Sequence, residues 1–250
     1  MARDTIPKSQ IALEPKEFPV ADIRTEMVEF QSNGSTTPGY LARPEGDGPF
    51  PGVIVIQEWW GLNDNIKDIA ERFAREGFAA FAPDLYHGDV AGNHEPDVAQ
   101  KKMMSLDMAR ASQELVKAAE HLNSQPFIKS DGIGAIGFCM GGGLAMTLAT
   151  DTPLIRAVAP FYGMSPSPVD KVQNLQGPIF AVYAEHDDWI GASVREKLHQ
   201  ALTEHGKTAE IKVYPGTHHG FFNDTRTEIY DAAASKDAWQ NVLKLFRANL

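Results

Sequence analysis

The chain has 250 residues, of which 43% are hydrophobic, so it is long enough to bury one large core. Its formal net charge of −10 argues against nucleic acid and anionic membrane surfaces as partners. A single cysteine excludes an intrachain disulfide and favours a reducing compartment. The N-terminus lacks the apolar stretch of a signal peptide, and no segment approaches the roughly 20 apolar residues of a membrane-spanning helix. We therefore expect a soluble cytoplasmic protein.

The chain divides into a short arm and one domain. Residues 1–24 are polar and contain three prolines, which is typical of an extended arm. Residues 25–250 contain no repeat, low-complexity tract or linker, and we expect them to form a single domain. Its first elements are two strands, 27–31 and 39–43, joined by the turn 32–35 into an antiparallel hairpin.

Strands and helices alternate after the hairpin. A helix capped by Asn63 or Asp64 and ended by Gly77 follows the first buried strand. A long helix follows the polar stretch 87–96, and its expected buried face consists of Ala109, Ser112, Val116, Ala119 and Leu122. The chain ends in an amphipathic helix. The expected strands are 53–56, 78–82, 132–136, 155–161, 179–184 and 211–214. This alternation predicts an α/β fold with a mostly parallel, doubly wound sheet and helices on both faces.

One segment has the pattern of a nucleophile elbow. Gly137-Phe138-Cys139-Met140-Gly141 follows an apolar strand and opens a helix of small residues. The glycines permit the tight turn and close backbone approach that this motif requires. A thiol reacts as its thiolate, and the N-terminus of the helix favours the negative charge. Cys139 is therefore the candidate nucleophile; the alternative is a small buried residue packed between glycines.

Acidic residues and histidines follow two later strands. Asp187 and Asp188 come just after 179–184, and His218 and His219 come after 211–214. The order nucleophile, acid, histidine is that of α/β-hydrolases. The histidine would act as general base and the aspartate would orient it. Spacing alone does not decide which member of each pair takes part.

An acidic residue also follows the strand 53–56. Glu58 would accept a proton from the thiol if burial and hydrogen bonding set its pKa suitably. The oxyanion hole of this fold lies in the same place, formed by the backbone N–H groups of Trp59 and Met140.

Together these residues resemble the dienelactone hydrolase family, the cysteine branch of the α/β-hydrolases. The resemblance extends from about Val53 to the C-terminal helix and rests on five motifs: Gln57-Glu58-x-x-Gly61, Pro83-Asp84-Leu85-Tyr86, Gly137-x-Cys139-x-Gly141-Gly142, Asp187 and His219-x-Phe221. It implies that Asp187 and His219 complete the triad and that Glu58 holds or takes the thiol proton. It further implies acyl transfer from an ester or lactone to Cys139, followed by hydrolysis, with no cofactor or metal.

The substrate is less well defined. Family members that act on dienelactone carry two arginines that hold its carboxylate, where this chain has Gly88 and Asn223. We therefore expect a less charged or more aromatic ester. The candidate substrate-binding residues are Trp60, Tyr86, His87, Tyr162 and Phe222. The alternatives are a non-hydrolytic binding module and an acyltransferase or thioesterase that uses the same triad, and the oligomeric state is left open.

Overall fold

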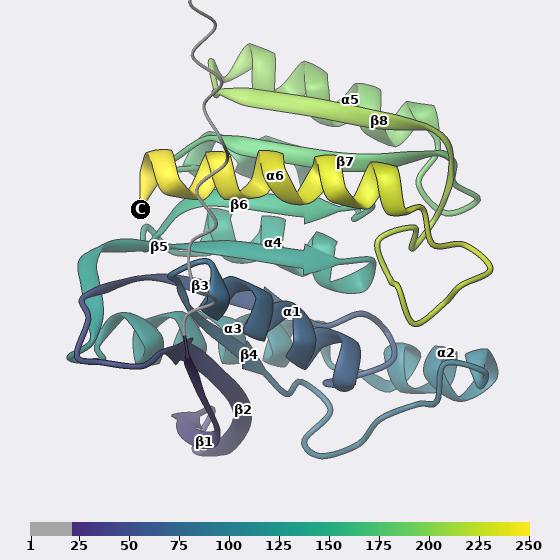
Figure 1. Ribbon diagram of the computed structural model, residues 1–250. Helices are drawn as coiled ribbons and strands as arrows, with labels where there is room; N and C mark the ends of the chain where they lie inside the picture. The colour runs from purple at the N-terminus through teal and green to yellow at the C-terminus, as the bar shows by residue number, and fades with distance from the viewer. Residues whose placement is uncertain (1–21) are drawn as a thin grey trace, which may run out of the picture.

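The computed structural model describes residues 22–250 (Figure 1). Residues 1–21 of the expected arm lie outside the described residues, and the first strand begins at Ile23, within the range 1–24. The strands are β1 (Ile23–Ser32), β2 (Ser35–Pro44), β3 (Phe50–Ile56), β4 (Ala79–Pro83), β5 (Ile128–Phe138), β6 (Ile155–Phe161), β7 (Ile179–His186) and β8 (Ala209–His218). The helices are α1 (Asp64–Arg75), α2 (Pro96–Ser105), α3 (Met108–Asn123), α4 (Met140–Asp151), the 3-10 helix η1 (Val169–Asn174), α5 (Ala192–Glu204) and α6 (Ala232–Asn249).

The strands form one eight-stranded sheet with the order β1-β2-β4-β3-β5-β6-β7-β8. Strand β2 is antiparallel to both β1 and β4, whereas the strands from β4 to β8 pair in parallel. The β1-β2 hairpin turns at Asn33 and Gly34, whose φ values of 48° and 78° match a type I′ turn. The expected doubly wound, mostly parallel sheet with an N-terminal hairpin is confirmed.

Helices cover both faces of the sheet, with α1 and α6 in front of it in Figure 1 and α3, α4 and α5 behind it. Successive residues of β3 point to opposite faces because the side chains of a strand alternate. Ile54 and Ile56 lie in the core cluster with α3, α4 and α5, whereas Val53 and Val55 lie in the cluster with α1 and α6. All four are fully buried, which explains the uninterrupted apolar run of this central strand.

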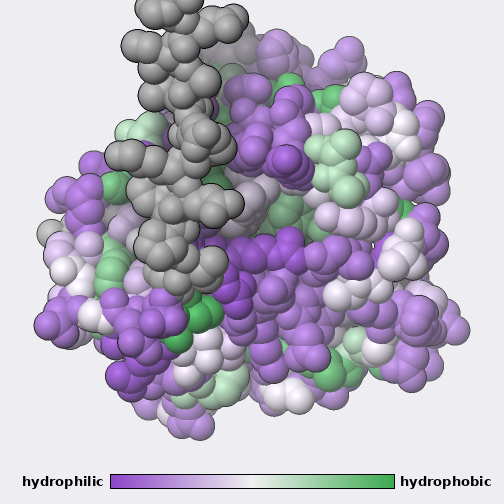
Figure 2. All heavy atoms as spheres, in the orientation of Figure 1, coloured by the Kyte–Doolittle hydropathy of each residue, from purple (hydrophilic) through white to green (hydrophobic). Residues whose placement is uncertain are grey.

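The outer surfaces of the front helices are mainly polar. Figure 2 shows the same side of the molecule, with hydrophilic residues over most of it and hydrophobic residues in small scattered patches. The inner face of α1 is mainly apolar and includes the fully buried Phe73. Asn63 is the cap, because its side-chain oxygen accepts a hydrogen bond of 3.2 Å from Ile66 N.

The structure corrects part of the expected face of the long helix. Ala119 and Leu122 are buried as expected, and Ser112 and Val116 are half-buried. Ala109 is exposed, however, and the buried face of α3 is centred on Leu115 and Ala118. Glu114 is also on the buried face, because His87 and Arg110 pair with its carboxylate at 3.1 and 2.8 Å. Because of these ion pairs Glu114 is buried, although the hydrophobic pattern predicts that this residue faces solvent. The polar segment before α3 also contains a separate helix, α2, with only Ala99 buried.

The parallel strands of the sheet have their carboxyl ends at the same edge. The β5 and β6 arrows in Figure 1 point to the right, where α2 and the loop between β8 and α6 lie. Reactive groups of such sheets are found beyond these ends. Within residues 22–250, no helix combines the length and the apolar character needed to cross a membrane.

Candidate active site

Cys139 lies at a strained turn between β5 and α4. Its φ of 55° and ψ of −119° are unusual for a residue with a side chain, and such geometry costs about 1–3 kcal/mol. Two backbone hydrogen bonds fix the turn, from Cys139 N to Phe161 O at 3.1 Å and from Gly142 N to Cys139 O at 3.0 Å. The turn presents the thiol at the N-terminus of α4, where unpaired N–H groups favour negative charge.

The glycines around Cys139 are required by close backbone approach. A Cβ on Gly137 would clash with the carbonyl of Gly141, and one on Gly141 would clash with the end of β3. A Cβ on Gly142 would come within 2.5 Å of Phe161 O in the neighbouring strand. The glycines of the G-x-C-x-G-G sequence thus allow α4 to pack closely against β3 and β6.

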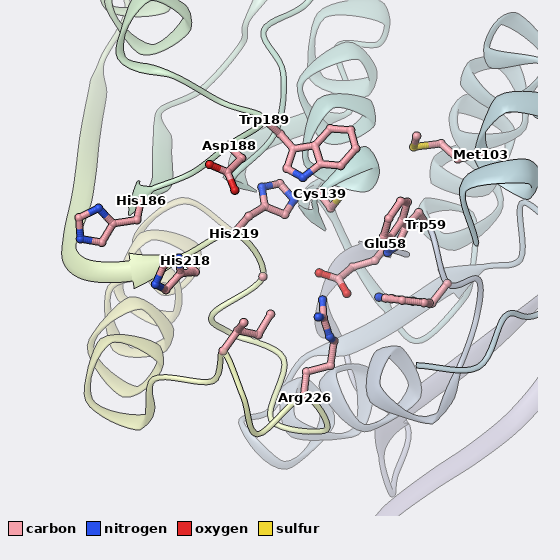
Figure 3. Close-up of a pocket in the computed structure, with 13 residues that line it drawn as sticks. Glu58, Trp59, Met103, Cys139, His186, Asp188, Trp189, His218, His219 and Arg226 are labelled. Carbon is pink, nitrogen blue, oxygen red and sulfur yellow. The ribbon is translucent and has the colours of Figure 1, made fainter. Parts of the chain in front are cut away.

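Asp187 and His219 form a hydrogen-bonded pair beside the thiol. His219 Nδ1 lies 3.0 and 2.9 Å from the two carboxylate oxygens of Asp187, whose side chain is fully buried. The same carboxylate accepts the backbone N–H groups of Trp189 and Ile190, each at 2.9 Å. In residues 22–250 the other ring nitrogen, Nε2, is buried without a hydrogen-bond partner. Figure 3 shows the His219 ring next to Cys139.

Asp187 and His219 each shift the pKa of the other in the direction that favours its charged form. Burial lowers the pKa of His219, but hydrogen bonding to Asp187 and negative charge on Cys139 outweigh it and raise the pKa to about 10. Burial likewise raises the pKa of Asp187, but its bond to His219 and the two backbone N–H groups hold the pKa below the ordinary value. An imidazolium at His219 is therefore favoured over a wide pH range.

The neighbouring candidates, Asp188 and His218, line the same cavity as His219 but are not part of the hydrogen-bonded pair. Asp188 is exposed and forms no bond to His219. His218 is also exposed, and its ring lies 5.4 Å from that of His186 (Figure 3). In the described part of the chain, no three His, Cys, Asp or Glu side chains are grouped so that they could hold a metal ion.

Glu58 is buried and held by two donors. Asn223 Nδ2 donates to Glu58 Oε2 at 3.1 Å, and the Tyr162 hydroxyl donates to Oε1 at 3.4 Å. Burial raises the pKa of Glu58, while Asn223 and the charges of His219 and Arg226 act in the opposite direction. The carboxyl group is thus able to exchange a proton closer to neutral pH than an exposed glutamate.

The two expected oxyanion donors are available. No acceptor in the described residues receives the N–H of Trp59 or of Met140. Trp59 is held by its carbonyl oxygen, which accepts a hydrogen bond of 3.1 Å from the Tyr86 hydroxyl. Tyr86 itself follows a turn closed by the carboxylate of Asp84, which accepts the Tyr86 and Gly88 N–H groups.

Two cavities meet at Cys139 and share His219, Trp189 and Met103 as walls. The first measures about 310 Å³ and contains polar groups, among them Glu58 and Arg226, whose side chains point toward each other in Figure 3. The second measures about 400 Å³ and extends along α4 and the loop after β6. We call them the polar cavity and the apolar cavity.

The candidate substrate-binding residues are placed differently. Trp60 lines the polar cavity and Tyr162 lines the apolar cavity. Neither Tyr86, His87 nor Phe222 is among the residues that line the two cavities. His87 instead pairs with Glu114, and Phe222 is buried in a stack on Phe138 at 5.3 Å.

Several residues of the site were not assigned to it by the sequence, among them Asn223, Trp189 and Arg226. The sequence indicates Asn223 only as the replacement of an arginine, whereas in the structure its side chain is buried against Glu58. Trp189 is 58% exposed and forms a wall of both cavities. Its position directly after Asp187-Asp188, in a loop that follows a strand, was the available signal.

Comparison with known proteins identifies relatives along most of the chain. A "Protein usf" of Aquifex pyrophilus is 39% identical over 232 residues, which cover 90% of this chain and 99% of that protein. A protein of Saccharolobus solfataricus, provisionally named a carboxymethylenebutenolidase, is 37% identical over 254 residues, covering 87% of this chain and 96% of its own. The crystal structure of a protein from Klebsiella pneumoniae, provisionally named a dienelactone hydrolase, superposes with a TM-score of 0.83 at 32% identity, covering 90% of this chain and 99% of the other. Since the model of the dienelactone hydrolase family also matches residues 37–250, the chain belongs to that family and is a hydrolase of ester or lactone bonds.

Proposed function

We propose that this chain hydrolyses carboxylic esters or lactones through an acyl-enzyme on Cys139. The observation that carries the proposal is the buried Asp187–His219 pair, whose free Nε2 lies beside the one thiol of the chain at the N-terminus of α4. A nucleophile, a base and a group that orients the base are the parts that covalent acyl transfer needs.

The reaction follows from these positions. The thiolate of Cys139 attacks the carbonyl carbon, and the electron pair moves to the carbonyl oxygen, which the N–H groups of Trp59 and Met140 stabilise. The tetrahedral intermediate expels the alcohol, which takes a proton from His219 Nε2. Water then attacks the thioester and gives a proton to His219, and the carbon–sulfur bond breaks to release the acid.

Glu58 takes up the thiol proton in this scheme. It lines the polar cavity together with Cys139, and its burial suits it to hold a proton. Asp187 keeps the Nδ1 proton on the side away from the substrate, so that Nε2 faces the reaction. Asp187, His219 and Glu58 thus have separate tasks.

The test is a panel of small esters and lactones with wild type and Cys139→Ala. We expect the alanine variant to lose turnover and covalent labelling by a thiol-directed ester mimic. Cys139→Ser should be a poor enzyme, because the site is arranged to deprotonate a thiol rather than an alcohol. Undiminished turnover by Cys139→Ala would refute the mechanism. Products analysed with an added alcohol separate hydrolysis from acyl transfer, since a transferase would form the new ester.

A further inference from the structure

The apolar cavity has no task in the chemistry described above. It begins at Cys139 and extends along the first turns of α4, where Gly143, Leu144 and Thr147 form one wall. The loop 162–167 and Ile190 form other walls. Neither Glu58 nor Arg226 belongs to its lining, so the two cavities extend from the thiol in different directions.

Methionines dominate this lining. Met103, Met108, Met140 and Met164 come from three helices or their flanks and from the loop after β6, and all contribute to the same cavity. Methionine side chains adapt to apolar groups of varied shape. The lining contains four hydroxyl groups, from Thr147, Tyr162, Ser165 and Ser167. That of Thr147 donates to Gly143 O at 3.1 Å and that of Tyr162 donates to Glu58, whereas that of Ser165 is buried without a hydrogen-bond partner among the described residues. His219, at the end next to the thiol, is the one ionisable residue of the lining apart from Cys139 and Tyr162.

Large apolar side chains are also left exposed where this cavity meets solvent. Met108, Met164 and Trp189 are 47%, 54% and 58% exposed, although each lines the cavity. Exposed apolar groups gathered in one place mark a binding surface more often than single exposed residues do. Their grouping next to the thiol indicates a ligand that enters from solvent.

We propose that the apolar cavity binds an apolar substituent of the substrate, an alkyl chain or an unsubstituted ring, while the ester carbonyl lies at Cys139. This assignment rests on the proposed function of the same site and names its substrate class. The cavity has the size range of sites for small molecules. Each methylene that moves from water into it should raise the specificity for the substrate about fourfold.

The first experiment needs no hydrolysis. Alkyl methanethiosulfonates convert a thiolate into a mixed disulfide with release of methanesulfinate, and Cys139 is the only thiol available. Second-order labelling rates are measured with methyl, butyl and hexyl reagents and divided by the rates with free cysteine. We expect the normalised rate to rise by about fourfold per added methylene over the first carbons. Equal normalised rates for methyl and hexyl reagents would overturn the assignment.

Variants locate the effect. Thr147→Phe fills the cavity from α4 and should lower the hexyl-to-methyl ratio at least about tenfold. Met164→Asp places a charge at the exposed wall of the cavity and should also lower the hexyl-to-methyl ratio. Because Met164 is exposed, this substitution should not disturb the packing of the core. Met104→Asp is its matched control, since Met104 is 76% exposed and lines neither cavity. An unchanged ratio in both cavity variants, or an equal fall in Met164→Asp and Met104→Asp, would overturn the assignment.

Ester turnover separates this inference from the proposed function. The kcat/KM values for p-nitrophenyl acetate and hexanoate are measured on the same proteins. Selective labelling without turnover of either ester would refute the proposed hydrolysis and leave the cavity assignment standing. Turnover through Cys139 with no preference for the longer chain, and labelling that is likewise insensitive to length, would refute the cavity assignment alone.

Discussion

Asn223 Nδ2 donates a hydrogen bond of 3.1 Å to Glu58 Oε2, and both side chains are buried. Asn223 stands where family members that act on dienelactone carry a substrate-binding arginine. In this chain the position supports the carboxylate that lines the polar cavity. The Asn223 oxygen in turn accepts the N–H and hydroxyl groups of Thr225, so the amide is fixed in orientation.

Removal of this donor should impair catalysis in a pH-dependent way. Burial raises the pKa of Glu58, and the hydrogen bond from Asn223 is the largest effect that lowers it. Asn223→Ala removes this hydrogen bond, so the pKa of Glu58 should rise further. If Glu58 must be ionised, the acidic limb of the kcat/KM profile should move to higher pH. A hydrogen bond to a charged group is worth about 1.5–3 kcal/mol, so kcat/KM at neutral pH should fall about tenfold to hundredfold. Thr225→Val removes a hydroxyl donor to the Asn223 oxygen but keeps the Asn223 donor to Glu58, so it should move the acidic limb less than Asn223→Ala does.

The two adjacent histidines should differ sharply. His219→Asn removes the ring that bonds Asp187 and should lower kcat on the order of 10⁴-fold. His218→Asn changes an exposed ring and should lower kcat less than about threefold. Steady-state kinetics of both variants, with circular dichroism as the folding control, test this. Similar losses in two folded variants would contradict the assignment.

The sequence predicted those parts of the site that follow from strand order. Residues placed just after strands of a parallel sheet converge on one edge, which brings together Cys139, Asp187, His219 and Glu58. Motif resemblance selected Asp187 and His219 from their neighbours, and the hydrogen bonds make the same selection. Strand order and motif together therefore predict this grouping without any information on side-chain packing.

The parts that sequence analysis missed depend on contacts between distant segments. Glu114 is buried because the distant His87 pairs with it, which shifts the face of α3 and removes His87 from the cavities. Asn223 faces Glu58 across 165 residues of chain. Aromatic residues near the site, such as Phe222, proved to belong to the core. No periodicity encodes such pairs.

The raised pKa of His219 should appear in the stability of the protein. The ring titrates near 10 when folded and near 6.5 in its ordinary state, so between these pH values the folded protein holds a proton that the unfolded chain has lost. The free energy of unfolding of wild type, relative to His219→Asn, should therefore be largest below about pH 6.5 and decline as the pH rises toward 10. Urea unfolding at several pH values measures this. Cys139→Ala removes one of the groups that raise the pKa of His219 and should therefore narrow this pH window. A relative stability that rises with pH would contradict the ion pair.

Arg226 supplies a positive charge to the polar cavity. Its guanidinium lies 5.5 Å from the centre of the Trp60 ring and pairs with Glu228 at 2.8 Å, and the side chain is 27% exposed. The Arg226 guanidinium is therefore held in one orientation and remains accessible to a ligand in the polar cavity. The burial of Asn223 against Glu58 leaves no comparable access at that position.

Arg226 should accordingly determine how well the enzyme accepts anionic substrates. A charge-assisted contact to a carboxylate contributes about 1.5–3 kcal/mol, so Arg226→Gln should lower kcat/KM for dienelactone about tenfold to hundredfold. The value for a neutral ester such as p-nitrophenyl butyrate should change less than about threefold. Arg75→Gln is the matched control, because Arg75 pairs with Glu71 on the outer side of α1 and lines neither cavity. A proportional loss on both substrates would mean that Arg226 acts through Glu58 or through folding. In that case dienelactone should be a poorer substrate than neutral aryl or alkyl esters even for wild type, because no described arginine would then hold its carboxylate.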